Sequence, residues 1–216
     1  MTSKSDKPDI ERGFDRNVDY LVMKRRLLKS LKKTMKNLGI VGPKMKRILM
    51  NRIIYCLIAI IQLRNGSRIS EAVTAMRLFI EADNFTDKVT VKIAKSETLK
   101  YKKDTGEQYM TKRRHRRIMF PMDWFDANKI LPILKGVNSY ILHIKEDRLK
   151  KRVLDYLRKY HKCNTHSLRY ACINYLLYIK KLEMGIVAKF VGHSNVNQLV
   201  TYTQLKNTDK IFDMDI

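Results

Sequence analysis

The longest apolar run of the chain, residues 53–63, has to be placed out of contact with water. A helix that spans a bilayer needs about 20 apolar residues, so this shorter run predicts a buried core helix, expected over about residues 43–64. Asn65-Gly66 follows the run, and glycine often ends a helix in the left-handed conformation. The run therefore predicts the core of a globular protein rather than a membrane anchor.

The charge of the chain is its second constraint. Lysine and arginine outnumber aspartate and glutamate so far that the net charge is +24 in 216 residues. Such an excess predicts a polyanionic partner, and nucleic acid is the first candidate because phosphate neutralisation dominates its binding. Ribosomal and membrane-surface proteins can be equally basic, so charge alone leaves those classes open. Three scattered cysteines favour a reducing compartment over a disulfide framework or a zinc site.

The spacing of apolar residues predicts an α+β protein that is mostly helical. A basic amphipathic helix is expected over residues 20–38, before a break at Gly42-Pro43. A short helix over 70–76 should precede a small three-stranded antiparallel sheet with strands at 78–82, 88–94 and 117–122. Further helices are expected at 124–134, 146–160, 167–181 with Thr165 as N-cap, 184–191 and 195–203.

Near the C-terminus, a group of polar residues indicates a functional site. His166 and Arg169 are three residues apart in a predicted helix, so they share one face and can address the same ligand. A Gly-His pair that contains His193 comes next, followed by Tyr202. Because no metal-binding cluster lies nearby, a phosphate is the expected ligand.

Arg68 and Glu71 complete this group from far upstream, at the junction of two predicted helices. The chain thus presents Gly-x-Arg-x-x-Glu, a lysine on a predicted hairpin, His-x-x-Arg, Gly-His and a late tyrosine, in that order. This order resembles the catalytic domain of the tyrosine recombinases, the phage-integrase family. The likeness spans roughly residues 44–204, and it is the ordered set that is specific, since each piece alone is weak.

The resemblance implies metal-free cleavage of a phosphodiester. Arg68 and Arg169 would grip the scissile phosphate, because the planar guanidinium stays charged and can engage two phosphate oxygens. Tyr202 would attack the phosphorus and form a 3′-phosphotyrosyl bond, while Glu71 would help to orient the neighbourhood. The covalent bond conserves the energy of the broken one, so no cofactor, ATP or metal is implied.

The resemblance also implies the proton transfers. Lys95 would protonate the leaving 5′ oxygen, His166 would assist proton transfer and bind phosphate, and His193 would hydrogen-bond a non-bridging oxygen. The short Gly-Lys-Gly turn that is usual in the family is absent here. Lys92 and Lys100 therefore remain alternatives to Lys95 as the general acid.

A second set of cations is predicted to contact the DNA backbone rather than to do chemistry. No acidic residue occurs between residues 20 and 52, and a long run of one charge calls for a counter-charge. The predicted DNA contacts are Lys24, Arg25, Arg26, Lys29, Lys32 and Lys33 in the basic helix, and Lys112, Arg113, Arg114 and Arg116 before the last strand.

The resemblance implies a site-specific recombinase of a virus or other mobile element. Its partners would be double-stranded DNA and further copies of itself, as a tetramer on two duplexes, with no membrane. It would act inside the cell on DNA, in the host cytoplasm or nucleus, or belong to a virion. Residues 1–43 would form a basic extension, 44–204 the catalytic domain and 205–216 a tail.

Two other functions remain open from the sequence. A type IB topoisomerase makes the same intermediate, although it generally has Lys-x-x-Arg where this chain has His-x-x-Arg. A non-catalytic basic DNA-binding protein with the same fold should lack the nucleophile or a clamp arginine. Family members usually carry a separate helical domain ahead of the catalytic one. Three alternatives stay open: the basic helix at 20–38 takes its place, the chain is a fragment, or the enzyme is minimal.

Overall fold

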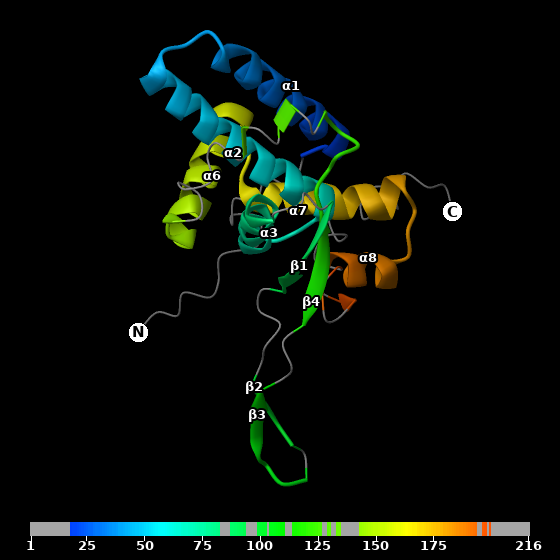
Figure 1. The fold of residues 1–216 in the computed structure, drawn as a ribbon. Coiled ribbons are helices and arrows are strands. Elements are labelled where there is room, and N and C mark those ends of the chain that lie inside the picture. The colour runs from blue at the N-terminus through cyan, green and yellow to red at the C-terminus, as the bar shows by residue number, and fades with distance from the viewer. Residues whose placement is uncertain are drawn as a thin grey trace, which may run out of the picture.

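Helix α2 (Pro43–Asn65) forms the centre of the fold (Figure 1). The computed structural model describes residues 18–82, 87–93, 99–102, 104–110, 114–126, 129–130, 133–134, 143–193, 196–197 and 199. Among the described helices, α2 is the one long and apolar enough to cross a membrane, but 67% of that stretch is buried inside the protein. The expectation of a core helix is confirmed, and so is the left-handed C-cap, since Gly66 has φ of 55°.

Helix α1 (Tyr20–Leu38) lies along α2 and shares its core (Figure 1). Its buried side chains, Tyr20, Met23, Leu27 and Leu31, recur every three or four residues and form one stripe. Asp19 caps the helix by accepting a hydrogen bond from the backbone of Val22 at 2.7 Å. The predicted basic amphipathic helix is thus confirmed, and it packs as part of the main hydrophobic cluster.

Helix α3 (Ile69–Glu81) is longer than the sequence suggested. The expected strand over residues 78–82 is wrong, because the helix continues through nearly all of that segment. Phe79 and Ile80 extend the helical spacing of buried Val73 and Met76. The composition of a short apolar run is compatible with a strand or with a helix. Here its buried residues continue the spacing of the preceding helical turns, which favours a helix.

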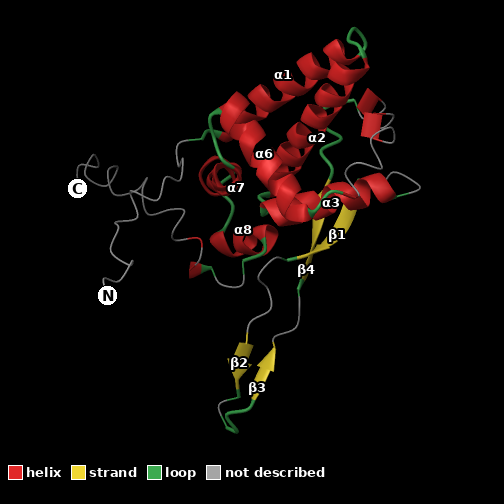
Figure 2. Cartoon of the chain, turned by 90° about the vertical axis from the view of Figure 1, so that its left-hand side faces the viewer, coloured by secondary structure: helices red, strands yellow, loops and turns green. Residues whose placement is uncertain are grey.

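The strands form two separate antiparallel pairs within the described residues, not one three-stranded sheet. Strand β1 (Lys88–Lys92) pairs with β4 (His115–Met119), and β2 (Leu99–Tyr101) pairs with β3 (Gln108–Met110). The β2–β3 ribbon projects away from the helices (Figure 2). A small antiparallel sheet in a mostly helical protein is therefore confirmed, whereas the number and arrangement of strands differ.

The C-terminal half is helical as predicted. Helices α6 (Glu146–His161), α7 (Thr165–Asn174) and α8 (Met184–Val191) follow one another, with a π-helical segment η2 (Tyr175–Ile179) after α7. The N-cap of α7 is Asn164 rather than Thr165, since the Asn164 side chain accepts from the Ser167 backbone at 3.0 Å. Of the helix expected at 124–134, residues 124–126 are not helical, whereas the described residues 129–130 and 133–134 are. The helix expected at 195–203 lies largely outside the described residues.

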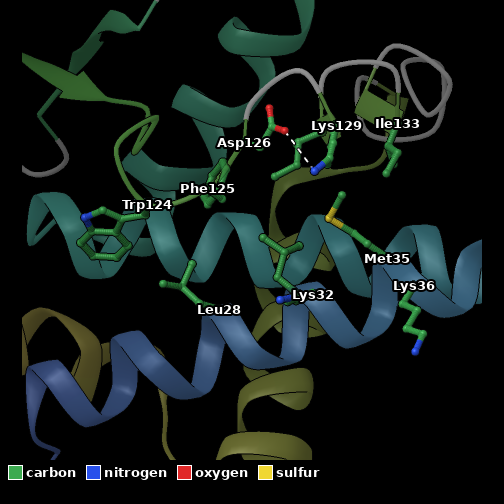
Figure 3. Close-up of a pocket in the computed structure, with 11 residues that line it drawn as sticks. Leu28, Lys32, Met35, Lys36, Trp124, Phe125, Asp126, Lys129 and Ile133 are labelled. Atoms are coloured by element: carbon green, nitrogen blue, oxygen red, sulfur yellow. Dashed lines mark ion pairs between the residues drawn. The ribbon is translucent and has the colours of Figure 1, made fainter.

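An apolar groove separates α1 from the segment that follows β4 (Figure 3). Lys32 and Lys36 of α1 lie at it, and Lys129 pairs with Asp126 across 3.2 Å. None of the predicted catalytic residues lines this groove. Its apolar lining is Leu28, Leu31, Met35, Trp124, Phe125, Ile130 and Ile133.

Candidate active site

The turn after α2 collects two arginines from distant parts of the chain. Arg116 of β4 donates from Nη2 to the carbonyl of Asn65, and Arg169 of α7 donates from Nη1 to the carbonyl of Gly66. The last carbonyls of a helix lack partners within it and carry the negative end of its dipole. The C-terminus of α2 is therefore a favourable place for two guanidinium groups.

Arg169 is the more deeply buried of the two, with 1% of its surface exposed. Its Nη2 lies 2.9 Å from Nε2 of His193, just after α8. A guanidinium can only donate, so Nε2 of His193 accepts in this arrangement and the imidazole is neutral. A hydrogen bond from His193 to a phosphate oxygen would then have to come from its Nδ1.

Gly66 makes this close assembly possible. A β-carbon at this position would lie 2.8 Å from Cγ1 of Val191 and 3.2 Å from Sγ of Cys172. Its positive φ is also one that residues with side chains rarely adopt. The absence of a side chain at Gly66 thus lets α8 approach the turn and bring His193 against Arg169.

Arg68 lies at the junction of α2 and α3, where the sequence places it. Its backbone N–H donates to Oε2 of Glu71 at 3.1 Å, and its Nη1 donates to Oε1 at 3.3 Å. The Glu71 side chain is fully buried, whereas 25% of the Arg68 side chain is exposed. Glu71 therefore holds both the start of α3 and one edge of the Arg68 guanidinium.

Arg116 is a member of this cluster, although the sequence predicts that it contacts the DNA backbone. Its side chain does not lie on the surface, since Arg116 is 8% exposed and its Nη1 lies 3.5 Å from Oε2 of Glu71. Burial lowers its pKa to about 10 despite the charge of Glu71, and the charges of Arg169 and Arg68 lower it further. Arg116 therefore remains a cation at neutral pH.

One sequence signal could have located Arg116. Side chains alternate between the two faces of a strand, and in β4 the buried positions are Arg116 and Ile118, while His115 and Arg117 are exposed. The apolar Ile118 marks the inward face, and Arg116 is two residues away on that same face. Because neighbouring positions are also basic, this alternation is not apparent in the sequence.

The other predicted catalytic residues are only partly placed. His166 is exposed in the first turn of α7, with its ring centroid 5.6 Å from that of Tyr170. Lys92 is exposed at the end of β1, and Lys100 lies in β2. Lys95 and Tyr202 lie outside the described residues, as do Lys112 and Arg113 of the predicted DNA contacts. The structure brings together Arg68, Glu71, Arg116, Arg169 and His193.

The cations of α1 lie in a different environment. Lys24 is half-buried, with its Nζ 4.2 Å from the ring centroid of Trp124. The remaining predicted contacts in α1 are all exposed: Arg25, Arg26, Lys29, Lys32 and Lys33. Arg114, which precedes β4, is exposed as well.

No group of three potential metal-ligating side chains occurs among the described residues.

Three curated proteins are similar in sequence. A Sputnik virophage protein named as integrase V10 is 46% identical over 211 residues, 97% of this chain and 93% of that protein. A protein of Acidianus two-tailed virus named as integrase ORF241 is 32% identical over 71% of this chain and 52% of its own length. An uncharacterised protein of Methanocaldococcus jannaschii is 31% identical over 74% of this chain and 72% of its own length. No family model matches the sequence.

Two solved structures are similar in fold. The XerH site-specific recombinase bound to its difH substrate before cleavage has a TM-score of 0.49 and 16% identity, covering 92% of this chain and 53% of XerH. The post-cleavage complex has a TM-score of 0.43 and 18% identity, covering 86% and 52%. The assignment of this chain to a family rests on sequence similarity, because the virophage integrase matches over nearly the whole of both chains. The chain belongs to the tyrosine recombinase (integrase) family.

Proposed function

We propose that this protein is a site-specific DNA recombinase that cuts and rejoins DNA through a covalent 3′-phosphotyrosyl intermediate. Relatives named as integrases, from a virophage and a virus, support a role in integrating a viral element. The protein would then act on double-stranded DNA inside the host cell. Its productive form would be a tetramer that holds two duplexes.

The observation that carries the proposal is the cationic cluster around the turn after α2. Arg68 and Arg116 both face the carboxylate of Glu71, and the positive charge of Arg169 also acts on Arg116, so the cluster keeps an excess of positive charge. A phosphate group bound there would offset the repulsion among these cations. Positioned donors of this kind stabilise the charge that develops on phosphate oxygens in the transition state.

The proposed chemistry breaks one phosphorus–oxygen bond for each one formed. The Tyr202 oxygen attacks the phosphorus, and the bond to the 5′ oxygen breaks as Lys95 protonates it. His166 assists the proton transfers, and the Arg68–Arg169 pair holds the phosphate. Attack by a 5′-hydroxyl of the partner strand reverses these steps and releases Tyr202. The energy of the phosphodiester is retained throughout, so no ATP or metal enters the proposed scheme.

The exposed cations of α1 would bind the DNA backbone. Their contribution would depend strongly on salt, because each phosphate contact releases condensed counterions. Such contacts set affinity without choosing a sequence. The proposal therefore separates binding by α1 from chemistry at the buried cluster.

The test is a nicked duplex whose cleavage releases a short fragment and traps the covalent complex. The purified protein is incubated in chelator without ATP, with a pool of DNA that includes the ends of the element. The proposal predicts a protein–DNA adduct that survives denaturant and is absent for Tyr202→Phe. Tight DNA binding by the wild type with no adduct on any substrate would contradict it.

A second experiment separates recombination from relaxation. Both proposed outcomes share the same intermediate, so only the fate of the strands differs. A recombinase joins a labelled strand from one duplex to a second duplex, whereas a topoisomerase rejoins the same strand and removes supercoils. Relaxation without strand exchange on a cleaved site would favour the topoisomerase.

A further inference from the structure

The carboxylate of Glu71 is shared by two arginines. Oε1 faces Nη1 of Arg68 at 3.3 Å, and Oε2 faces Nη1 of Arg116 at 3.5 Å. Both Glu71 and Arg116 are buried, whereas a quarter of the Arg68 side chain reaches solvent. The two arginines therefore differ in their access to a ligand, and the more exposed one is Arg68.

Arg116 is held by more than this ion pair. Its Nη2 donates to the Asn65 carbonyl, and its guanidinium carbon lies 5.5 Å from the ring centroid of Phe190. Its Cδ would be 3.4 Å from a β-carbon placed on Gly192. Contacts from α2, α8 and the turn before His193 thus fix the guanidinium beside Glu71.

The hydrogen bonds of Arg116 are incomplete in the part of the chain that the structure describes. Its Nε and Nη1 have no hydrogen-bond acceptor there, so the contact with Glu71 is an ion pair without good hydrogen-bond alignment. Buried donors without acceptors are costly and uncommon. A guanidinium kept in such a place at neutral pH points to an electrostatic role rather than to packing.

We infer that Arg116 is a positioning residue that balances the charge of Glu71 and so leaves Arg68 available to a phosphate. An isolated buried carboxylate attracts every nearby cation strongly. Without Arg116, Glu71 would draw the Arg68 guanidinium into pairing with both of its oxygens and turn it away from the ligand. With Arg116 present, Glu71 holds Arg68 by one edge only. The inference rests on the proposed role of Arg68 as a phosphate ligand.

The experiment measures the affinity of the site for inorganic phosphate by following the side-chain Nε–H signal of Arg68 in NMR spectra, assigned with Arg68→Lys. Arg116→Met removes the charge and keeps much of the volume. It should weaken phosphate binding at Arg68 about tenfold, the effect of losing one well-placed interaction with a charged group. Arg117→Met, an exposed arginine of the same strand, is the matched control and should leave this affinity unchanged.

The decisive variant is Glu71→Gln combined with Arg116→Met. If Arg116 acts by balancing Glu71, removal of both charges frees Arg68 again, and phosphate affinity should return to within about threefold of the wild type. If Arg116 instead touches the phosphate or only fills space, the double variant will be as weak as Arg116→Met or weaker. That result, or an unchanged affinity in Arg116→Met, would overturn the inference.

Two further readouts make the result unambiguous. Thermal unfolding identifies any variant that fails to fold, and Arg116→Lys, which keeps the charge, should then give partial recovery of phosphate affinity. Adduct formation on the nicked duplex is measured on the same variants. If phosphate affinity follows the expected pattern while the wild type forms no adduct, the proposed recombinase chemistry fails and the role of Arg116 stands.

Discussion

Helix α1 and the turn after α2 both concentrate positive charge, but they place it in opposite environments. The cations of α1, such as Arg25, Lys29 and Lys33, are exposed on a helix whose other face packs on the core. Those at the turn, Arg116 and Arg169, are buried and donate to backbone carbonyls. The residue types are similar, while the surroundings differ completely.

The difference between exposed and buried cations corresponds to two different functions of a positive charge. Exposed cations are hydrated and screened, so each contributes little on its own and acts mainly by releasing counterions from DNA. A buried guanidinium is costly to desolvate, and it is retained where its partners fix its direction. The first kind suits affinity, and the second suits the stabilisation of charge at one defined point.

The largest effect is expected at Arg169. Arg169→Met leaves the Gly66 carbonyl and Nε2 of His193 without their guanidinium partner. Removal of one positioned donor from a site of developing charge costs roughly 100- to 1,000-fold in rate, and we expect adduct formation to fall at least that far. The measurement is the single-turnover rate on the nicked duplex with DNA in excess. A loss below tenfold in a folded variant would contradict the assignment of Arg169 to the clamp.

The next largest effect is expected at Gly66. Gly66→Ala combines an unfavourable positive φ with a β-carbon 2.8 Å from Val191, so α8 or the turn must shift. We expect a loss of roughly 1–3 kcal/mol in the free energy of unfolding and slower adduct formation, because α8 precedes His193. Chemical denaturation measures the first quantity. Gly185→Ala is the control, since a β-carbon there meets nothing within 4 Å, and it should not destabilise the protein.

The two regions also differ in how far the sequence predicts them. The periodicity of apolar residues in α1 gave its limits and its exposed cations, because an amphipathic helix is encoded locally. The pairing of Arg169 with the Gly66 carbonyl joins residues 103 positions apart, and no local pattern reports that contact. The ordered motif predicts Arg68, Arg169 and His193 as site residues by resemblance, but it does not report the interactions that hold them.

The failures of sequence interpretation have physical causes. Residues 78–82 were expected to form a strand, because a short apolar run is compatible with a strand or with a helix. Only the helical spacing of the buried residues in α3 distinguishes the two. Arg116 was expected to contact the DNA backbone as one of a run of basic residues, whereas the alternation of side chains in β4 turns it inward. In both cases, the periodicity of the element was a better guide than composition.

A smaller effect is expected from the charge of α1. Arg25→Gln with Lys29→Gln should weaken DNA binding, and the slope of log affinity against log salt should fall by roughly 0.9 for each phosphate that is no longer neutralised. The plateau rate of adduct formation should not change, because neither side chain belongs to the buried cluster. Fluorescence anisotropy across a salt series measures the slope. An unchanged slope would show that α1 faces away from the DNA; Lys151→Gln on α6, also exposed, serves for comparison.

The smallest effect is expected from the protonation of His161, which is buried at the end of α6. Burial lowers the pKa of this histidine in the folded protein, and the positive charge of Arg26 on α1 lowers it further. The unfolded chain therefore takes up its proton first, so His161 destabilises the fold as the pH falls below about 6.5. The melting temperature should drop between pH 7.5 and pH 5.5, and this drop should be smaller in His161→Gln. An equal drop in both proteins would assign it to other groups.

The most direct test of the division between buried and exposed cations is the single-turnover rate of adduct formation as a function of DNA concentration. Arg169→Lys and the α1 double variant are compared with the wild type, since lysine keeps the charge of Arg169 but cannot reproduce its two-sided hydrogen bonding. The account predicts that Arg169→Lys lowers the plateau rate with little change in the half-saturating DNA concentration, and that the α1 variant does the reverse. If both variants lowered the plateau alike, or if Arg169→Lys changed only the half-saturating concentration, the division would be contradicted.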